Sequence, residues 1–371
     1  MIRKLPFLFV CLTTLLLTLA GSPAVPTADT RVVAIGDIHG DFDAFVGILQ
    51  RASLVDANRR WSGRNTTLVQ TGDFLDRGPK TRAVMDLLMQ LQKDAPRQQG
   101  RVIVLLGNHE TANIFGDMRY VTNNDYASYK DDKSDRRRKS AYETYASLEN
   151  SGPRLSEDAW MKTHPAGYIE HREAFGPDGK YGKWLRTLPA VAQVNDSIFL
   201  HGGINPEFAT WKIERINEVI AFEIKAFDAY RKYMVDEKIA LPFYALTELT
   251  DAATAALKDP QSTDPNRKKF LEAFLGLGGW LSIHPDGPLW FRGFAHWNDE
   301  EGAASIKQLT TAFGIARFVV GHTPQQPAQI GSRFNGQVYL IDTGMLSNYY
   351  PGGRASALEI VGDKVTPLYN R

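Results

Sequence analysis

Short apolar runs alternate with amphipathic stretches between residues 31 and 108. The runs at 31–35, 66–72 and 101–108 are rich in β-branched residues and predict buried strands. The stretches at 42–54 and 81–95 carry apolar residues at helical spacing, and Pro79 stands just before the second. This strand–helix alternation is typical of a parallel α/β core.

The rest of the chain divides into polar, helical and strand-like sections. Residues 123–145 are polar and mixed in charge, and the regular apolar pattern is lost there. Within them, Arg136–Lys139 form either a solvated face or mobile loop, or a basic lip that attracts phosphorylated ligands. Residues 206–280 show helical spacing and predict a helical insertion or cap. The runs at 197–201, 316–322, 336–345 and 355–369 predict late strands.

The N-terminal sequence is typical of a signal peptide. Arg3 and Lys4 precede an apolar run from Leu5 to Ala20, and small residues follow. We predict a signal peptide over 1–24, cleaved after Ala20 or Ala24, with a retained anchor helix as the alternative. The single cysteine, Cys11, lies in this run, so the mature chain would have no disulfide and no Cys ligand. Together these features predict a periplasmic or secreted protein, anchored to the inner membrane if the signal is uncleaved.

Composition narrows the range of partners. The 371 residues are 43% apolar and 23% charged, which is ordinary for a globular protein. The net charge of +1 provides no overall attraction to nucleic acid or to an anionic membrane. We therefore expect no nucleic-acid partner, and no membrane association once the signal is cleaved.

Polar residues that are able to bind metals follow the predicted strands. Because ligands gather at the carboxyl ends of strands in α/β sheets, we expect these residues to converge. Oxygen and imidazole donors without sulfur suit Mn, Fe or Zn, and one shared carboxylate can bridge two such ions. Asp73 is central in chain order and is our candidate for the bridge. Glycines flank the donors, which indicates sharp turns or close backbone approach. The candidate ligands are Asp37, His39, Asp73, Asn108, His201 and His322.

Five motifs in order resemble those of the calcineurin-like metallophosphoesterases. These are "GDIHGD", "GDFLDRGP", "LLGNHE", "LHGGINP" and "VVGHTP". The second and third resemble the phosphoprotein phosphatase branch, while "GDMRYV", "GPLWFRG" and "IDTGM" resemble the bacterial Shewanella-like protein phosphatases. The resemblance implies an α/β fold, a β-sandwich flanked by helices (α/β/β/α) with a helical insertion. It also implies one domain over 30–371, with insertions at about 117–190 and 206–290.

The resemblance also implies a role for each motif residue. Asp37, His39 and Asp73 would hold the first of two divalent ions, and Asp73, Asn108, His201 and His322 the second. A hydroxide shared by both ions would attack phosphorus in line. His109 would protonate the leaving oxygen, with Asp76 orienting its ring. The expected phosphate-binding residues are Arg77, Arg292 and Asn108.

Departures from the family pattern leave the substrate open. The last motif reads "GHTP", with Pro324 where many metallophosphoesterases have a second His, and the "SAPNY" segment of eukaryotic Ser/Thr phosphatases is absent. We expect a phosphorylated protein or peptide, with phosphate on Ser/Thr or Tyr, or a small phosphoester. The alternatives are a diadenosine polyphosphate hydrolase and a non-catalytic metal-binding scaffold. Asp41 and Glu110 are expected to cap helices or support the ligands.

Overall fold

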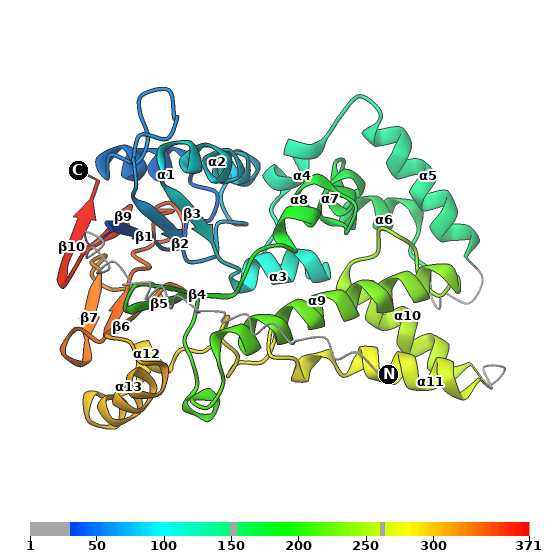
Figure 1. The fold of residues 1–371 in the computed structure, drawn as a ribbon. Helices are drawn as coiled ribbons and strands as arrows, with labels where there is room; N and C mark the ends of the chain where they lie inside the picture. Colours follow the sequence, from blue (N-terminus) through cyan, green and yellow to red (C-terminus); the bar gives the residue numbers. More distant parts are fainter. Residues whose placement is uncertain (1–29, 149–153, 260–263, 371) are drawn as a thin grey trace, which may run out of the picture.

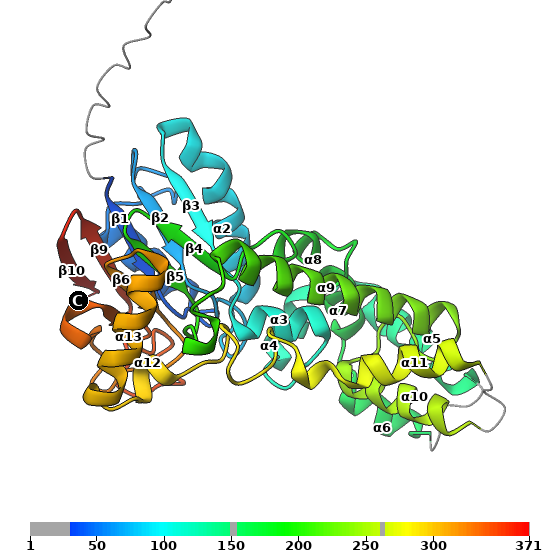
Figure 2. The same cartoon turned by 60° about the horizontal axis from the view of Figure 1, so that its bottom comes forward.

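The computed structural model describes residues 30–148, 154–259 and 264–370. The predicted signal segment, 1–24, lies outside these residues. Figures 1 and 2 show a two-sheet sandwich with helices at one end of the molecule and an elongated helical half at the other. Among the described residues, no helix is long and apolar enough to cross a bilayer.

The first sheet has the strand order β10-β9-β1-β2-β3. Its centre contains the predicted parallel strands β1 (Val32–Ile35), β2 (Thr67–Gln70) and β3 (Arg101–Val104). The hairpin of β9 (Ser356–Val361) and β10 (Lys364–Tyr369) adds antiparallel strands at one edge. Both β1 and β2 are buried on both faces, and the sequence of β1 is accordingly a continuous apolar run.

The second sheet has the order β4-β5-β6-β8-β7. Strands β5 (Ser197–Leu200), β6 (Arg317–Val320) and β8 (Val338–Leu340) are parallel. The edge strands β4 (Val191–Val194) and β7 (Gly331–Arg333) are antiparallel to their neighbours. The parallel pairing predicted for the strands between residues 31 and 108 is confirmed in the first sheet, while at the edges of the second sheet short connections favour antiparallel pairing.

The two sheets pack face to face between helical layers. Buried residues from both sheets, such as Val69, Ile103, Phe199 and Val319, form one apolar cluster between them. Helices α1 (Phe42–Arg51) and α2 (Thr81–Asp94) flank the first sheet, and α12 (Gly293–His296) and α13 (Asp299–Phe313) lie beside the second (Figure 1). This arrangement confirms the predicted helix-flanked sandwich.

The helical half comes from two stretches of chain. Between β3 and β4 lie α3 (Asn108–Phe115), α4 (Asn123–Tyr129), α5 (Ser134–Ser147), α6 (Glu157–Thr163), α7 (Tyr168–Phe175) and α8 (Lys180–Leu185). Between β5 and α12 lie α9 (Ile213–Asp236), α10 (Leu246–Lys258) and α11 (Pro265–Leu275). Short 3₁₀ turns occur at Ala95–Gln98, Pro206–Phe208, Leu277–Gly279 and Phe334–Gly336. The proposed division into one domain and two insertions stays a prediction.

Helices α4 and α5 occupy most of residues 123–145, so Arg136–Lys139 lie in a helix and not in a mobile loop. Helix α5 buries only Ser134, Ala141 and Tyr145, so its apolar periodicity is weak. Helix α4 is defined by the Thr122 cap, whose hydroxyl accepts from the backbone N–H of Asp125. In the basic run, Arg137 pairs with Asp131 at 3.0 Å and Arg138 with Asp135 at 3.2 Å, which favours a solvated face over a ligand-attracting lip.

Candidate metal centre

All six predicted metal ligands converge where the strands of both sheets end. Asp37 and His39 follow β1, Asp73 follows β2, and Asn108 opens α3. His201 comes directly after β5, and His322 follows β6. Asn108 was predicted at the end of a strand, but β3 ends at Val104 and Asn108 is the first residue of a helix. All six side chains belong to buried residues, no more than 5% exposed.

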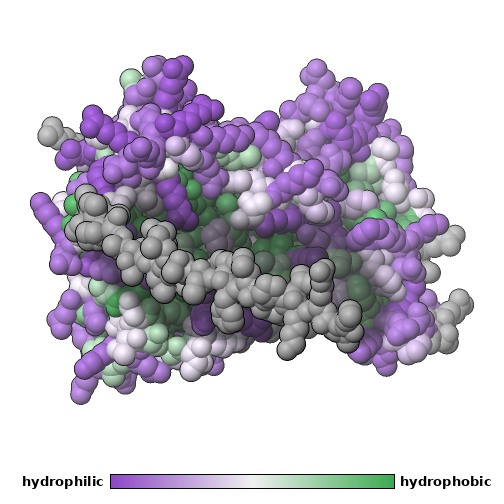
Figure 3. All heavy atoms as spheres, in the orientation of Figure 1, coloured by the Kyte–Doolittle hydropathy of each residue, from purple (hydrophilic) through white to green (hydrophobic). Residues whose placement is uncertain are grey.

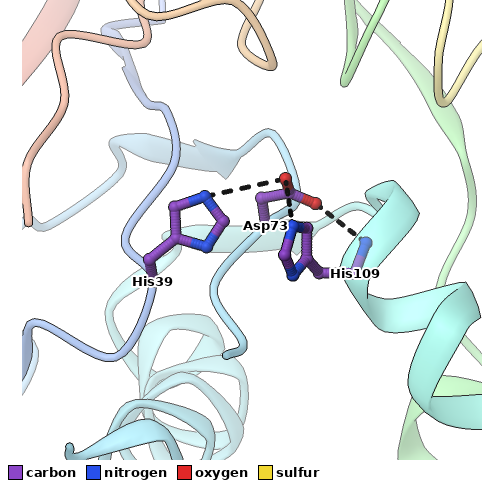
Figure 4. A group of neighbouring side chains, drawn as sticks. All are labelled: His39, Asp73 and His109. Carbon is purple, nitrogen blue, oxygen red and sulfur yellow. Dashed lines mark hydrogen bonds and ion pairs between the residues drawn. The ribbon is translucent and has the colours of Figure 1, made fainter. Parts of the chain in front are cut away.

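Asp73 is the centre of the cluster. Its Oδ2 lies 3.2 Å from Nε2 of His201, 3.8 Å from Nε2 of His39 and 3.8 Å from Nε2 of His109. Its Oδ1 accepts from the backbone N–H of His109 at 3.0 Å. Figure 4 shows the rings of His39 and His109 each directing a nitrogen at this carboxylate, and the rings are neighbours with centres 4.7 Å apart. Asp73 thus contacts donors from several motifs at once.

The remaining ligands complete two groups that share Asp73. His201 Nε2 lies 3.0 Å from Oδ1 of Asn108 and 3.0 Å from Nδ1 of His322. Asp37 Oδ2 lies 3.8 Å from His39 Nε2. Donor atoms that ligate one ion about 2 Å away are separated by roughly 3 Å from each other. One metal-competent group therefore contains Asp73, His201 and His322, and another contains Asp73, His39 and His109.

The histidines are oriented by backbone carbonyls. Nδ1 of His39 lies 2.9 Å from the carbonyl of Leu75, and Nδ1 of His201 lies 3.0 Å from that of Thr71. In His322 the roles of the nitrogens are reversed, since Nε2 lies 3.0 Å from the carbonyl of Trp290. A carbonyl can only accept, so each ring donates there and directs its other nitrogen, with a lone pair, at the cluster. This is the arrangement that a metal-binding imidazole requires.

The guanidinium of Arg77 contacts the cluster at His39. Its Nη1 lies 2.6 Å from Nε2 of His39, and it also donates to the hydroxyl of Tyr350. The lone pair of His39 that accepts from Arg77 cannot bind a metal at the same time. The guanidinium must therefore move when His39 acts as a ligand.

The backbone at the site is strained. His39, Asp73 and His322 have φ of 46°, 55° and 68°, and Asp76 and Arg77 are also left-handed. Such conformations cost about 1–3 kcal/mol each and persist only where the surroundings impose them. The glycine-flanked turns were predicted, but the sequence did not reveal that the ligands themselves adopt this conformation.

Two glycines leave room for the ligand carboxylates. A Cβ at Gly107 would lie 2.3 Å from Oδ1 of Asp73, and a Cβ at Gly321 would lie 2.3 Å from Oδ1 of Asp37. Any side chain at these positions would displace a ligand. Close approach, as expected from the sequence, thus explains both glycines.

Glu110 holds the loop that carries Asp73. Its carboxylate accepts from the backbone N–H groups of Gly107, Asp73, Phe74 and Leu75 at 2.7–3.2 Å. Burial and the nearby Asp73 charge raise the pKa of Glu110 to about 8. The supporting role predicted for Glu110 is confirmed, and Asp41 caps α1 as expected, accepting from the N–H of Ala44 at 3.1 Å.

Buried negative charge accumulates at the site. Burial and the charge of Asp342 raise the pKa of Asp37 well above its ordinary value. Burial also raises the pKa of Asp342 to about 6, with Asp73 adding to the effect. Burial acts on Asp73 in the same sense, but His201 and His109 outweigh it and hold the pKa of Asp73 low. Three buried carboxylates among imidazole rings are a donor set that divalent cations would stabilise. Asp342 was not recognised from the sequence.

His109 and Asp76 form a buried pair beside the cluster. His109 Nδ1 lies 2.7 Å from Asp76 Oδ2, and Asn113 donates to both oxygens of Asp76 at 3.0 Å. Although burial opposes protonation, Asp73 and Asp76 raise the pKa of His109 above its ordinary value. Asn113 was also missed, although it stands one helical turn after His109.

Aromatic side chains surround the guanidinium of Arg77. Its Cζ lies 4.9 Å from the ring centre of Tyr349, 5.6 Å from Tyr350 and 5.8 Å from Tyr120. Arg292, the other expected phosphate ligand, donates to the backbone carbonyl of His322 at 2.9 Å and to Thr323 Oγ1 at 3.0 Å. Both arginines therefore reach the site, and the three tyrosines are residues that the sequence did not reveal.

Comparison with known proteins settles the family. The calcineurin-like phosphoesterase model matches residues 30–326. The chain belongs to the calcineurin-like phosphoesterase family. Within this family it is 30% identical over 357 residues to Shewanella-like protein phosphatase 2 of Arabidopsis thaliana, covering 90% of this chain and 75% of the relative. It is 27% identical over 330 residues to Shewanella-like protein phosphatase 1 of Plasmodium berghei, covering 86% and 68%.

A solved structure shares the fold. The cold-active protein-tyrosine phosphatase of a psychrophilic Shewanella species superposes with a TM-score of 0.59 at 22% identity, over 92% of this chain and 80% of that one. Family membership and the clustered His and Asp donors identify this phosphoesterase as a metal-dependent phosphatase.

Proposed function

We propose that this phosphoesterase is a two-metal phosphomonoesterase that acts on phosphorylated proteins or peptides. The observation that carries the proposal is the position of Asp73, which belongs to both metal-competent groups. A carboxylate shared in this way is what a bridged pair of ions requires. The donor set suits Mn, Fe or Zn.

Each residue then has a distinct place. Asp37, His39 and Asp73 would hold one ion, and Asp73, Asn108, His201 and His322 the other. When bound, the ions would lower the pKa of water to supply a nucleophile and would neutralise phosphate charge. His109 is near enough to Asp73 to be considered a ligand, but Asp76 binds its other nitrogen and supports a proton on the ring.

His109 therefore acts as the proton donor to the leaving oxygen. A carboxylate at Nδ1 fixes the tautomer and leaves Nε2 directed at the cluster. Asp76 is a positioning residue, held in turn by Asn113. Arg77 and Arg292 bind the phosphate oxygens, with Asn108 beside them. Arg77 would have to leave His39 for that ring to act as a ligand, and its planar fork would then suit a phosphate.

Two relatives of this chain are named protein phosphatases, and this supports a protein substrate. Tyr120, Tyr349 and Tyr350 line the approach to Arg77, so the site offers aromatic contact to a substrate side chain.

The test compares a phosphotyrosine peptide, the matched phosphoserine peptide and diadenosine tetraphosphate, using enzyme reconstituted with a defined metal. We expect turnover of at least one peptide, lost on chelation and restored by metal. No hydrolysis of either peptide, or preference for the dinucleotide, would contradict the proposal.

The same proposal places the enzyme outside the cytoplasm, periplasmic or secreted, supported by the N-terminal pattern of Arg3, Lys4 and the apolar run from Leu5 to Ala20. N-terminal sequencing of the mature protein, together with cell fractionation, tests it. A mature chain that begins at Met1 in the cytoplasm would overturn this part.

A further inference from the structure

A cavity of about 520 Å³ lies in the helical half, between α7, the turn that follows it, and α9. None of the residues that line it belongs to the metal centre. Both helices run through the elongated part of the molecule (Figure 2). The volume is within the range of sites that bind small molecules. The lining residues include Ile169, Arg172, Glu173, Arg231, Val235 and Phe243.

Neither of the two arginines in this cavity forms an ion pair with a carboxylate of the described residues. Arg172 is 1% exposed, and its Nε has no hydrogen-bond partner there. Arg231 donates to the carbonyl of Pro242, and burial with the charge of Arg172 lowers the pKa of Arg231 to about 10. Asp228 also lines the cavity, but Arg186 holds both its oxygens at 2.7 and 2.8 Å. The charges of Asp228 and Glu248 act on these arginines without an ion pair, so the cationic charge is only partly compensated.

The remaining lining defines the kind of anion. Ile169, Val235 and Phe243 supply apolar surface, whereas the exposed part of the lining carries Glu173, Asp178 and Lys232. Two acidic residues against one lysine there disfavour ligands with several negative charges. We propose that this cavity binds an amphipathic monocarboxylate, with its carboxylate at Arg172 and Arg231 and its apolar chain against Ile169, Val235 and Phe243.

A chain of hydrogen bonds connects the cavity to the catalytic pair. Arg172 Nη1 donates to the carbonyl of Asn113 at 3.1 Å, and Asn113 in turn holds Asp76 beside His109. A carboxylate bound at Arg172 competes with that carbonyl for the same guanidinium. The site is therefore an effector site whose occupant changes kcat. This inference goes beyond the proposed function, because binding can be measured without any turnover.

Calorimetry with octanoate tests binding, with octanol as the uncharged control of equal length. We expect octanoate to bind and octanol to bind at least about tenfold more weakly, the usual effect of losing a charged hydrogen bond. Arg231→Gln should weaken the binding of octanoate by a similar factor. Val235→Trp should block octanoate binding, because the larger side chain fills the cavity. Arg215→Gln, on α9 but outside the cavity, should bind as the wild type does. Equal binding of octanol, or unchanged binding in both cavity variants, overturns the site.

Turnover of para-nitrophenyl phosphate tests whether binding in the cavity affects the catalytic pair, His109 and Asp76. Octanoate should change kcat in the wild type and in Arg215→Gln but not in Arg231→Gln, and acetate should have no such effect. Acetate is the control because its carboxylate can reach the metal centre just as that of octanoate can, but it lacks the apolar chain that fills the cavity. Purely competitive inhibition that is equal in all three proteins, or binding with no change in kcat, overturns the effector role.

Discussion

Nδ1 of His109 lies 2.7 Å from Oδ2 of Asp76, and both residues are at most 2% exposed. A carboxylate at this nitrogen keeps its proton in place and directs Nε2 at the cluster around Asp73. That Nε2 has no hydrogen-bond partner among the described residues and lies 3.8 Å from Asp73 Oδ2. In the proposed mechanism, this nitrogen would donate the proton to the leaving oxygen.

Replacing His109 by Asn should slow substrates in proportion to the basicity of their leaving groups. General acids contribute about 10²–10⁴-fold to rate, and mainly where the leaving oxygen needs a proton. We expect a loss in that range for an alkyl phosphate and a much smaller loss for para-nitrophenyl phosphate. Steady-state kinetics and metal analysis check this. Equal slowing of both substrates, or loss of metal, would argue that His109 is a ligand instead.

Asn113→Ala should slow protonation of the leaving oxygen by His109, because Asn113 holds Asp76 in place. Asn113 donates to both oxygens of Asp76 at 3.0 Å, and its removal frees that carboxylate. Loss of a supporting hydrogen bond at such a site typically costs about 10–100-fold in activity. We expect a fall in kcat for alkyl phosphates with little change in KM. The matched control is Asn217→Ala, which removes an amide that binds the backbone of β4, far from the pair. A purely structural role would raise KM or lower stability without changing the leaving-group dependence.

Asp73→Asn should abolish loading of both ions, because Asp73 belongs to both metal-competent groups. An amide provides one neutral oxygen where the carboxylate provides two charged ones. We expect metal affinity to fall by more than about 100-fold, beyond the effect of changing a supporting residue. Metal content after dialysis, measured beside Asp37→Asn, is the check. If Asp73 is the shared ligand, Asp37→Asn should retain one equivalent while Asp73→Asn retains none.

The positions of the ligands were predictable because local signals mark them. Asp37, Asp73 and His201 each follow a β-branched apolar run, and parallel strands bring their ends to one edge. Asn113, Tyr120 and Tyr350 carry no such signal, since their contacts with the site arise only from the packing of loops and helices far apart in sequence. Helices α4 and α5 were missed for a related reason: they bury few apolar residues, and their polar sequence resembles that of a loop.

Acid should destabilise the protein partly through His171. This residue on α7 is 2% exposed, its ring packs on Phe175 with centres 4.4 Å apart, and its Nδ1 has no partner among the described residues. Burial, and then the charge of Arg172, lower the pKa of His171 well below its ordinary value of 6.5. Below pH 6.5 the unfolded chain therefore binds a proton that the folded chain does not. Stability falls as the pH decreases from there, by roughly 1.4 kcal/mol per pH unit for this one group.

His171→Phe should flatten this acid dependence. Phenylalanine keeps the aromatic packing and removes both the titration and the unpaired nitrogen, so stability at pH 7 should change by less than about 1.5 kcal/mol. Urea unfolding of both proteins from pH 7 to pH 5 measures the difference, which should grow in favour of the variant as the pH falls. His284→Phe, at an exposed histidine, is the control and should keep the wild-type slope. Parallel stability curves for wild type and His171→Phe would show that His171 titrates as freely when folded as when unfolded.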